Sequence, residues 1–198
     1  MVSYLDAGKV SVTTPIGPYD LSSPLKGVYT LGFVPGATGV PGIIGDGTHL
    51  KSGTYTFTVT GGADVGPVTA SIDYPRSFVW NHDAITSVNR SQPLPITWTG
   101  GSPGALVSIL GNSSLGPGTT SDIGTAFTCW EDATKGSFTV PVSVLSALPP
   151  SYTDSHSHVH GNLQVVQAFY GTAFTATGID YGMIFYSDAY SKGFMPYI

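Results

Sequence analysis

The chain has 198 residues, of which 41% are hydrophobic and only 10% are charged, and its formal net charge is −5. Its 7 lysine and arginine residues are too few to form the basic surface that binds nucleic acid. It has neither a polybasic segment nor an apolar run of about 18 residues, so insertion into a membrane is not expected. Its 26 glycines and 15 prolines, together with many threonines and aromatic residues, indicate short strands joined by tight turns.

The first part of the chain contains the clearest strand signal, the stretch GTYTFTVT at residues 53–60. Tyr55 and Phe57 alternate with threonines, which is typical of a strand with one packed face and one hydrated face. Similar patterns predict strands at residues 8–14, 27–33 and 66–73. The segment 34–52 is rich in glycine and proline and is expected to form a long loop.

After Pro75, turn signals recur about every 8–12 residues, which is typical of β-sandwiches. Residues 141–150 have an apolar spacing between prolines that favours one or two helical turns. Trp98 is expected in the core of an immunoglobulin-like sheet. Further strands are expected at residues 77–80, 94–99, 105–110, 125–130, 136–140, 162–169, 172–177, 180–186 and 193–197. The sequence therefore predicts an all-β chain of two packed β-sandwich units, residues 1–75 and 76–198, the second of them immunoglobulin-like.

The patterns that match catalytic motifs are better explained as turns. Ser102 in GGSPG fits G-x-S-x-G, but that motif needs a strand-to-helix turn, and here Pro103 and a strand follow the serine. Glu131 and Asp132 are a candidate carboxylate pair, but their context, EDATKG, favours a hairpin turn. Cys129 lies in a strand pattern and is expected to be buried as a small apolar side chain. We therefore predict no enzymatic activity and no cofactor.

Three histidines, His156, His158 and His160, form the pattern H-S-H-V-H and are candidate metal ligands. In an extended chain their imidazoles share one face about 6.6 Å apart, so that two of them could bind a Zn or Cu ion. The alternative is a polar surface loop. Asp46 and Asp64 could offer oxygens to Ca²⁺, or could be turn residues whose carboxylates accept from their own backbone.

The C-terminal third of the chain is rich in aromatic residues, for which two interpretations compete. Phe174 and Phe185 alternate with polar residues and are expected in the core. Tyr186, Tyr190 and Tyr197 lie near small polar residues and could form an exposed platform. Such tyrosines stack on sugar rings or contact a protein partner, because they are amphipathic and lose little entropy on binding. These three residues are the candidate ligand-binding site.

Five stretches carry a resemblance that spans nearly the whole chain: YLDAGKVSV, SGTYTFTVTGGADVGPVTASI, VNRSQPLPITWTGG, AFTC and GSFTVPVSVLSALPP. Together they resemble a C-terminal β-rich region of large uncharacterised secreted proteins of soil bacteria, acidobacterial ones in particular. The resemblance implies export, a β-sandwich and a longer modular parent protein from which this chain is a piece. That family has no assigned activity, so the resemblance implies no functional residues.

These observations lead to three hypotheses about function. The first is a non-catalytic structural or adhesion module, secreted or at the cell surface, which assembles with copies of itself or with another surface protein. Edge strands such as residues 193–197 could extend a sheet into a neighbouring molecule. The second is a module that binds polysaccharide through the tyrosines. The third is a metal-binding protein that uses the three histidines.

Overall fold

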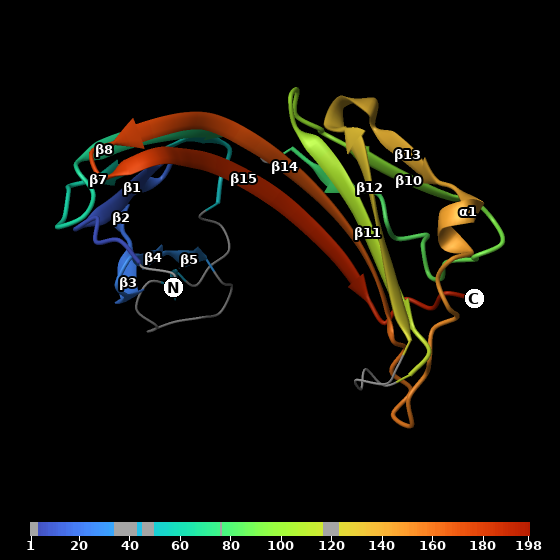
Figure 1. Cartoon of the computed structure of the whole chain (residues 1–198). Coiled ribbons are helices and arrows are strands. Elements are labelled where there is room, and N and C mark those ends of the chain that lie inside the picture. Colours follow the sequence, from blue (N-terminus) through green and yellow to red (C-terminus); the bar gives the residue numbers. More distant parts are fainter. Residues whose placement is uncertain (1–3, 34–42, 45–49, 76, 117–122) are drawn as a thin grey trace. The chain divides into compact units, whose positions relative to one another are not determined.

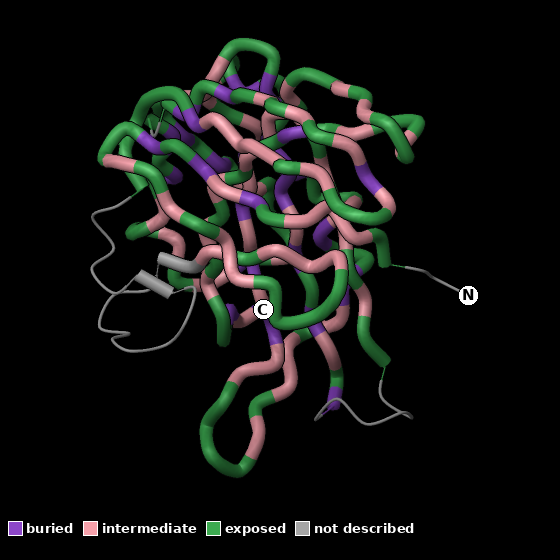
Figure 2. Tube along the Cα trace, turned by 90° about the vertical axis from the view of Figure 1, so that its left-hand side faces the viewer, coloured by how far each residue is buried: buried purple, intermediate pink, exposed green. Residues whose placement is uncertain are grey.

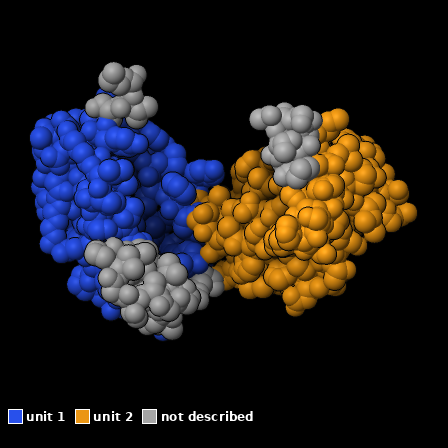
Figure 3. Space-filling model, turned by 90° about the horizontal axis from the view of Figure 1, so that it is seen from below, with its two compact units in different colours: residues 1–76, 170–186 blue, residues 77–169, 187–198 orange. Residues whose placement is uncertain are grey.

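The computed structural model describes residues 4–33, 43–44, 50–75, 77–116 and 123–198, and the chain divides into two compact units (Figures 1 and 3). Unit 1 comprises residues 1–76 and 170–186, and unit 2 comprises residues 77–169 and 187–198. The sequence predicted a second unit that is continuous from residue 76. The structure instead assigns residues 170–186 to unit 1, because β14 (Gly161–Ala176) and β15 (Ile179–Gly193) each contribute to both units.

Unit 1 is built on an antiparallel sheet of order β2-β1-β7-β8. The four strands in that order are Gly17–Asp20, Val10–Thr14, Gly53–Val59 and Val68–Tyr74. Two short pairs complete the unit: β3 (Ser22–Leu25) with β4 (Val28–Thr30), antiparallel, and β5 (Gly32–Phe33) with β6 (Ile43–Ile44), parallel. The predicted loop 34–52 lies mostly outside the described residues.

The core of unit 1 follows from the alternation of the strands. Val10 and Val12 of β1 are buried, and so are Tyr55 of β7 and Tyr74 of β8, whose rings meet edge to face. Threonines occupy the other face of β7. One of them, Thr56, forms a hydrogen bond to a serine hydroxyl across the strand pair. Strand β15 adds the buried Ile184 to unit 1.

Unit 2 contains two sheets, of orders β13-β10-β9 and β12-β11-β14-β15. The first consists of Ser137–Val140, Leu94–Thr99 and Val79–Trp80. The second joins β12 (Gly124–Asp132) and β11 (Leu106–Ser114) to the two long strands. Buried side chains of both sheets, such as Trp98 and Ile109, belong to one hydrophobic cluster. Along β10, buried positions alternate with more exposed ones, and along the first half of β14 buried positions alternate with half-buried ones. Figure 2 shows how buried, intermediate and exposed positions follow one another along the chain. The prediction of an all-β chain with packed antiparallel sheets is confirmed, while the likeness to immunoglobulin stays a prediction.

Two short helices lie between the strands of unit 2. The helical turns predicted for residues 141–150 are present as α1 (Val142–Leu145), which buries Leu145 and leads to the buried Leu148. A 3-10 turn, Ala133–Lys135, follows β12 and is capped by the side chain of Asp132. Among the described residues no helix is long and apolar enough to cross a membrane.

The C-terminal segment after β15 differs from the strand predicted at residues 193–197. Its backbone is held on both sides, because Met195 N donates to Gly161 O and Val88 N donates to Pro196 O. These bonds hold the segment within unit 2, so it does not provide a free edge for another molecule.

Candidate functional site

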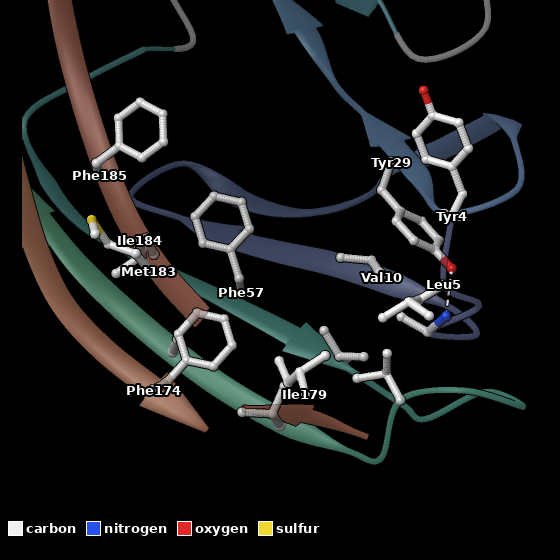
Figure 4. A pocket seen from close by; sticks show the side chains of 16 residues that line it. Tyr4, Leu5, Val10, Tyr29, Phe57, Phe174, Ile179, Met183, Ile184 and Phe185 are labelled. Atoms are coloured by element: carbon white, nitrogen blue, oxygen red, sulfur yellow. Dashed lines mark hydrogen bonds between the residues drawn. The ribbon is translucent and has the colours of Figure 1, made fainter. Parts of the chain in front are cut away.

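Unit 1 contains an apolar pocket with a volume of about 570 Å³ (Figure 4). One wall comes from the sheet, where Val10 and Phe57 face the space. The β14–β15 hairpin supplies the opposing residues Phe174 and Ile179. Phe174 was expected in the core and is half-buried at this wall. Phe185, also expected in the core, is 60% exposed and lines the pocket.

The segment before β1 and the β3–β4 hairpin line one part of the pocket. Tyr4, Leu5 and Ala7 contribute from the first of these, and Gly27 and Tyr29 from the second. Gly27 has a φ of +71°, and a Cβ there would lie 2.6 Å from Leu5 O. Glycine therefore lets the turn approach the N-terminal segment closely, which brings Tyr29 to the pocket.

The described residues of the lining are uncharged. The sixteen of them include no carboxylate, amine, guanidinium or imidazole. The tyrosine hydroxyls are the polar side-chain groups, and Tyr29 Oη accepts a hydrogen bond of 3.0 Å from Ala7 N. This hydroxyl keeps its own proton for donation to an acceptor on a ligand. The hydroxyl of Tyr4 points away from the other lining side chains (Figure 4). The pocket therefore suits an apolar molecule that has no formal charge.

Asp64, in the loop before β8, forms hydrogen bonds with the N-terminal segment that lines the pocket. Its Oδ2 accepts from Asp6 N at 2.8 Å and lies 3.0 Å from Lys26 Nζ. In return, Asp6 O accepts from the backbone N–H groups of Asp64 and Val65. The hydrogen bond from the Asp6 backbone, and then the Lys26 ammonium, hold the pKa of Asp64 below its ordinary value.

Replacing Asp64 by alanine is expected to lower the melting temperature slightly, by removing the carboxylate that holds the N-terminal segment. Because the folded-state pKa is lowered, the stabilisation is complete above the unfolded-state value of about 3.9. It is lost as the pH falls through the lower pKa of the folded state. Melting curves of the wild type and Asp64→Ala should thus differ at neutral pH and converge in acid. A difference that persists unchanged in strong acid would contradict this role.

The structure does not bring the three candidate tyrosines together within one unit. Tyr186 belongs to unit 1, where its ring packs edge to face on Tyr74 at 5.2 Å. Tyr190 and Tyr197 belong to unit 2. Tyr190 Oη donates to Phe78 O. Tyr197 is only 1% exposed, its hydroxyl donates to the backbone of unit 2, and burial raises the pKa of its phenol. The prediction that Tyr197 is exposed is therefore wrong. The backbone hydrogen bonds of the C-terminal segment hold its ring in the core of unit 2.

The three histidines lie in a tight loop rather than on an extended strand. Asp154 Oδ1 accepts from the backbone N–H groups of His156 and His158, and these bonds lower the pKa of Asp154. Asp154 Oδ2 lies 3.2 Å from His158 Nδ1 and 3.7 Å from His160 Nε2. His156 stacks on His158, with ring centroids 6.0 Å apart. In the part of the chain that the structure describes, no group of three or more His, Cys, Asp or Glu side chains could hold a metal ion.

The remaining candidates have structural explanations. Ser102 N donates to the buried Gln167 side chain in the turn before β11. Asp132 caps the 3-10 turn that follows β12. Cys129 is partly buried at the edge of the core, and desolvation raises the pKa of its thiol. Asp46 lies outside the described residues.

Sequence reasoning did not find the pocket. Its walls come from residues 4–29, 57–70 and 174–185, which are far apart in the chain. Alternation indicates which face of each strand is apolar, but it does not tell which apolar faces meet. The one available signal was the aromatic content of the hairpin, which we assigned to core or platform. Comparison of the chain with protein families, curated proteins and solved structures gives no match. The resemblance to secreted bacterial proteins therefore stays a prediction.

Proposed function

We propose that the protein is a non-catalytic extracellular module of the structural or adhesive type, and that unit 1 binds a small, neutral, apolar molecule. The pocket of about 570 Å³ carries the second part of this proposal. Small-molecule sites have volumes of about 300–1,000 Å³ and are lined mostly by apolar and aromatic side chains with a few polar groups. The low content of charged residues supports an extracellular module.

The ligand class follows from the lining. Apolar surface removed from water contributes about 25 cal/mol per Å², so aromatic and aliphatic walls favour a molecule that is largely hydrocarbon. A charged group would lose its hydration without gaining a partner. A hydroxyl or carbonyl oxygen near Tyr29 would gain a donor. An uncharged apolar compound with one acceptor oxygen satisfies these conditions.

The pocket is tested by filling it. Ala70 is half-buried on β8 and lines the pocket. We expect Ala70→Phe to occupy part of the volume and to weaken binding of the neutral dye Nile red at least about tenfold, since each 1.4 kcal/mol of lost burial is tenfold in affinity. The measurement is a fluorescence titration of the full chain.

A matched variant separates pocket filling from a general change in surface apolarity. Ala189→Phe adds the same ring at an exposed position of β15 in unit 2. It should leave the Nile red affinity unchanged or raise weak background binding. Circular dichroism checks that both variants are folded. If a folded Ala70→Phe variant bound Nile red as tightly as the wild type, the proposal that unit 1 binds an apolar molecule in this pocket would be wrong.

Self-assembly through an edge strand is the second candidate function, and one observation favours it. Strand β12 ends the order of its sheet, so one of its sides has no neighbouring strand among the residues that the structure describes. Binding of polysaccharide or metal has less support, because Tyr197 is buried and the described residues contain no cluster of three or more His, Cys, Asp or Glu side chains that could hold a metal ion.

A further inference from the structure

Within the described part of the chain, strand β12 presents a long edge that is free of a strand partner. It has nine residues, and the strand pairings of the described residues join it to β11 alone (Figure 1). The strand contains neither lysine nor proline, which are the residues that commonly block edges. Its acidic residues, Glu131 and Asp132, stand together at one end.

The backbone groups on the free edge can be assigned from the ladder. Leu115 N donates to Ile123 O, and Ala133 N donates to Ala105 O. Both bonds join residues that are opposite in the β11–β12 register, so the odd-numbered residues of β12 bond to β11. The even-numbered residues therefore direct their N–H and C=O groups away from β11. These residues are Gly124, Ala126, Thr128, Trp130 and Asp132.

The side chains of the same even-numbered residues are exposed. Trp130 is 56% exposed on the outer face, and Ala126 and Thr128 are exposed beside it. Phe127 and Cys129 point the other way and pack partly against the core of unit 2. Among these outward groups, the Asp132 N–H already donates to Glu131 Oε1. The edge thus combines the outward backbone groups of Gly124 to Trp130 with an exposed tryptophan and a half-covered apolar face.

We propose that β12 pairs antiparallel with β12 of a second copy of this chain, about a two-fold axis at Thr128. This deepens the self-assembly candidate and does not depend on the pocket in unit 1. The register uses all nine residues, because Gly124 and Asp132 are equidistant from Thr128. On such an axis a residue faces its own copy. The two copies exchange both hydrogen bonds only if the backbone N–H and C=O groups of that residue point away from β11, and those of Thr128 do.

The distribution of size and charge favours this register. Antiparallel pairing at Thr128 places Trp130 opposite Ala126, so that a large ring lies beside a small side chain. Phe127 lies opposite Cys129, which continues the apolar inner face. Glu131 lies opposite Thr125. A parallel, in-register pairing would instead place Glu131 and Asp132 against themselves, and like charges directly opposite are destabilising. Strand β12 is therefore complementary to a second copy of itself in the antiparallel orientation, which is the orientation that a two-fold interface requires.

Single cysteines test the register. In a Cys129→Ala background, Thr128→Cys should form a dimer under mild oxidation, because the Cα atoms of a hydrogen-bonded pair are about 5.5 Å apart, within disulfide range. Ala126→Cys is the matched control. Its Cα would lie about 14 Å from that of its own mate, beyond disulfide reach. Cross-linking of Ala126→Cys, or of native Cys129 to its mate, would overturn the register.

Sedimentation equilibrium tests the association itself. The wild type should dimerise as its concentration rises, and Thr128→Lys should raise the dissociation constant at least about tenfold, because it places two ammonium groups opposite each other. Thr99→Lys, at an exposed residue of β10, should leave it unchanged. A wild type that stays monomeric at its solubility limit would overturn the proposal. Nile red binding of that same monomer would leave the pocket proposal intact.

Discussion

Replacing Trp98 by alanine is expected to lower the free energy of unfolding by about 3–5 kcal/mol. Trp98 is 3% exposed, belongs to the cluster shared by the two sheets of unit 2, and lies 6.5 Å from the ring of Phe78. Its indole nitrogen donates a 2.7 Å hydrogen bond to Ala133 O. The substitution therefore leaves a large cavity and removes the hydrogen bond that joins this side chain to the 3-10 turn. Domains of this size are stable by only about 5–15 kcal/mol, so the variant should be close to unfolding.

Urea denaturation followed by far-ultraviolet circular dichroism measures this effect without relying on tryptophan fluorescence. Trp130→Ala is the control, because it removes the same side chain from an exposed position on β12. At low protein concentration it should cost less than about 1 kcal/mol. Trp98→Phe should fall between the two, since it keeps a ring in the core and loses the hydrogen bond. Equal costs for Trp98→Ala and Trp130→Ala would contradict the placement of Trp98 in the core.

Replacing Gly178 by alanine is expected to cost about 2–4 kcal/mol and to weaken Nile red binding as well. Gly178 forms the turn of the β14–β15 hairpin with a φ of +89°, where a residue with a Cβ is strained. The new Cβ would also overlap Asp64 O and would lie 3.4 Å from Val65 Cα. The turn must then move, which breaks the hydrogen bond from Gly66 N to Thr177 O and displaces the hairpin wall of the pocket.

Gly193→Ala is the control on the same hairpin. A Cβ at Gly193 meets no atom within 4 Å, so this change should be nearly neutral for stability and for dye binding. Thermal unfolding and a Nile red titration of both variants give the two measurements. If Gly178→Ala lost stability but bound the dye as tightly as the wild type, the hairpin would not form a wall of the pocket.

Alternation along the chain predicted much of the fold because most strands have one buried and one exposed face. The predicted strand at residues 94–99 has the bounds of β10, and residues 53–60 contain β7. Pro95 was expected at a strand start or an edge. It is the second residue of β10 and pairs with Thr139 of β13, whereas β9 pairs only with Trp98 and Thr99. The missing N–H of the proline therefore does not interrupt a ladder on the β9 side.

The long strands could not be predicted from local patterns. Residues 162–169 and 172–177 were expected to be two strands, but a single strand, β14, runs from Gly161 to Ala176. A Cβ at Gly171 would lie 2.7 Å from Ile184 O and 2.9 Å from a side-chain carbon of Ile72. Glycine is therefore required there by close packing and not by a turn, and sequence alone does not distinguish these two uses.

The candidate site was predicted less well because it depends on tertiary contacts. A tyrosine beside small polar residues can be exposed or buried, and the hydrogen bonds that bury Tyr197 connect it to distant parts of the chain. The histidine pattern correctly indicated a polar loop as one alternative. Its geometry, however, depends on the backbone bonds to Asp154, which no spacing rule reveals.

The passage of β14 and β15 through both units affects how the protein can be made. Residues 170–186 are synthesised only after residues 77–169. Unit 1 therefore cannot complete its folding when its first 76 residues leave the ribosome. A fragment that stops at residue 76 would lack the hairpin wall of the pocket. One that starts at residue 77 would carry Phe174, Met183 and Phe185 without the sheet that they face, and should aggregate on expression. Splitting this protein into soluble halves therefore requires the hairpin to be shortened between residues 169 and 187 rather than a cut at residue 76.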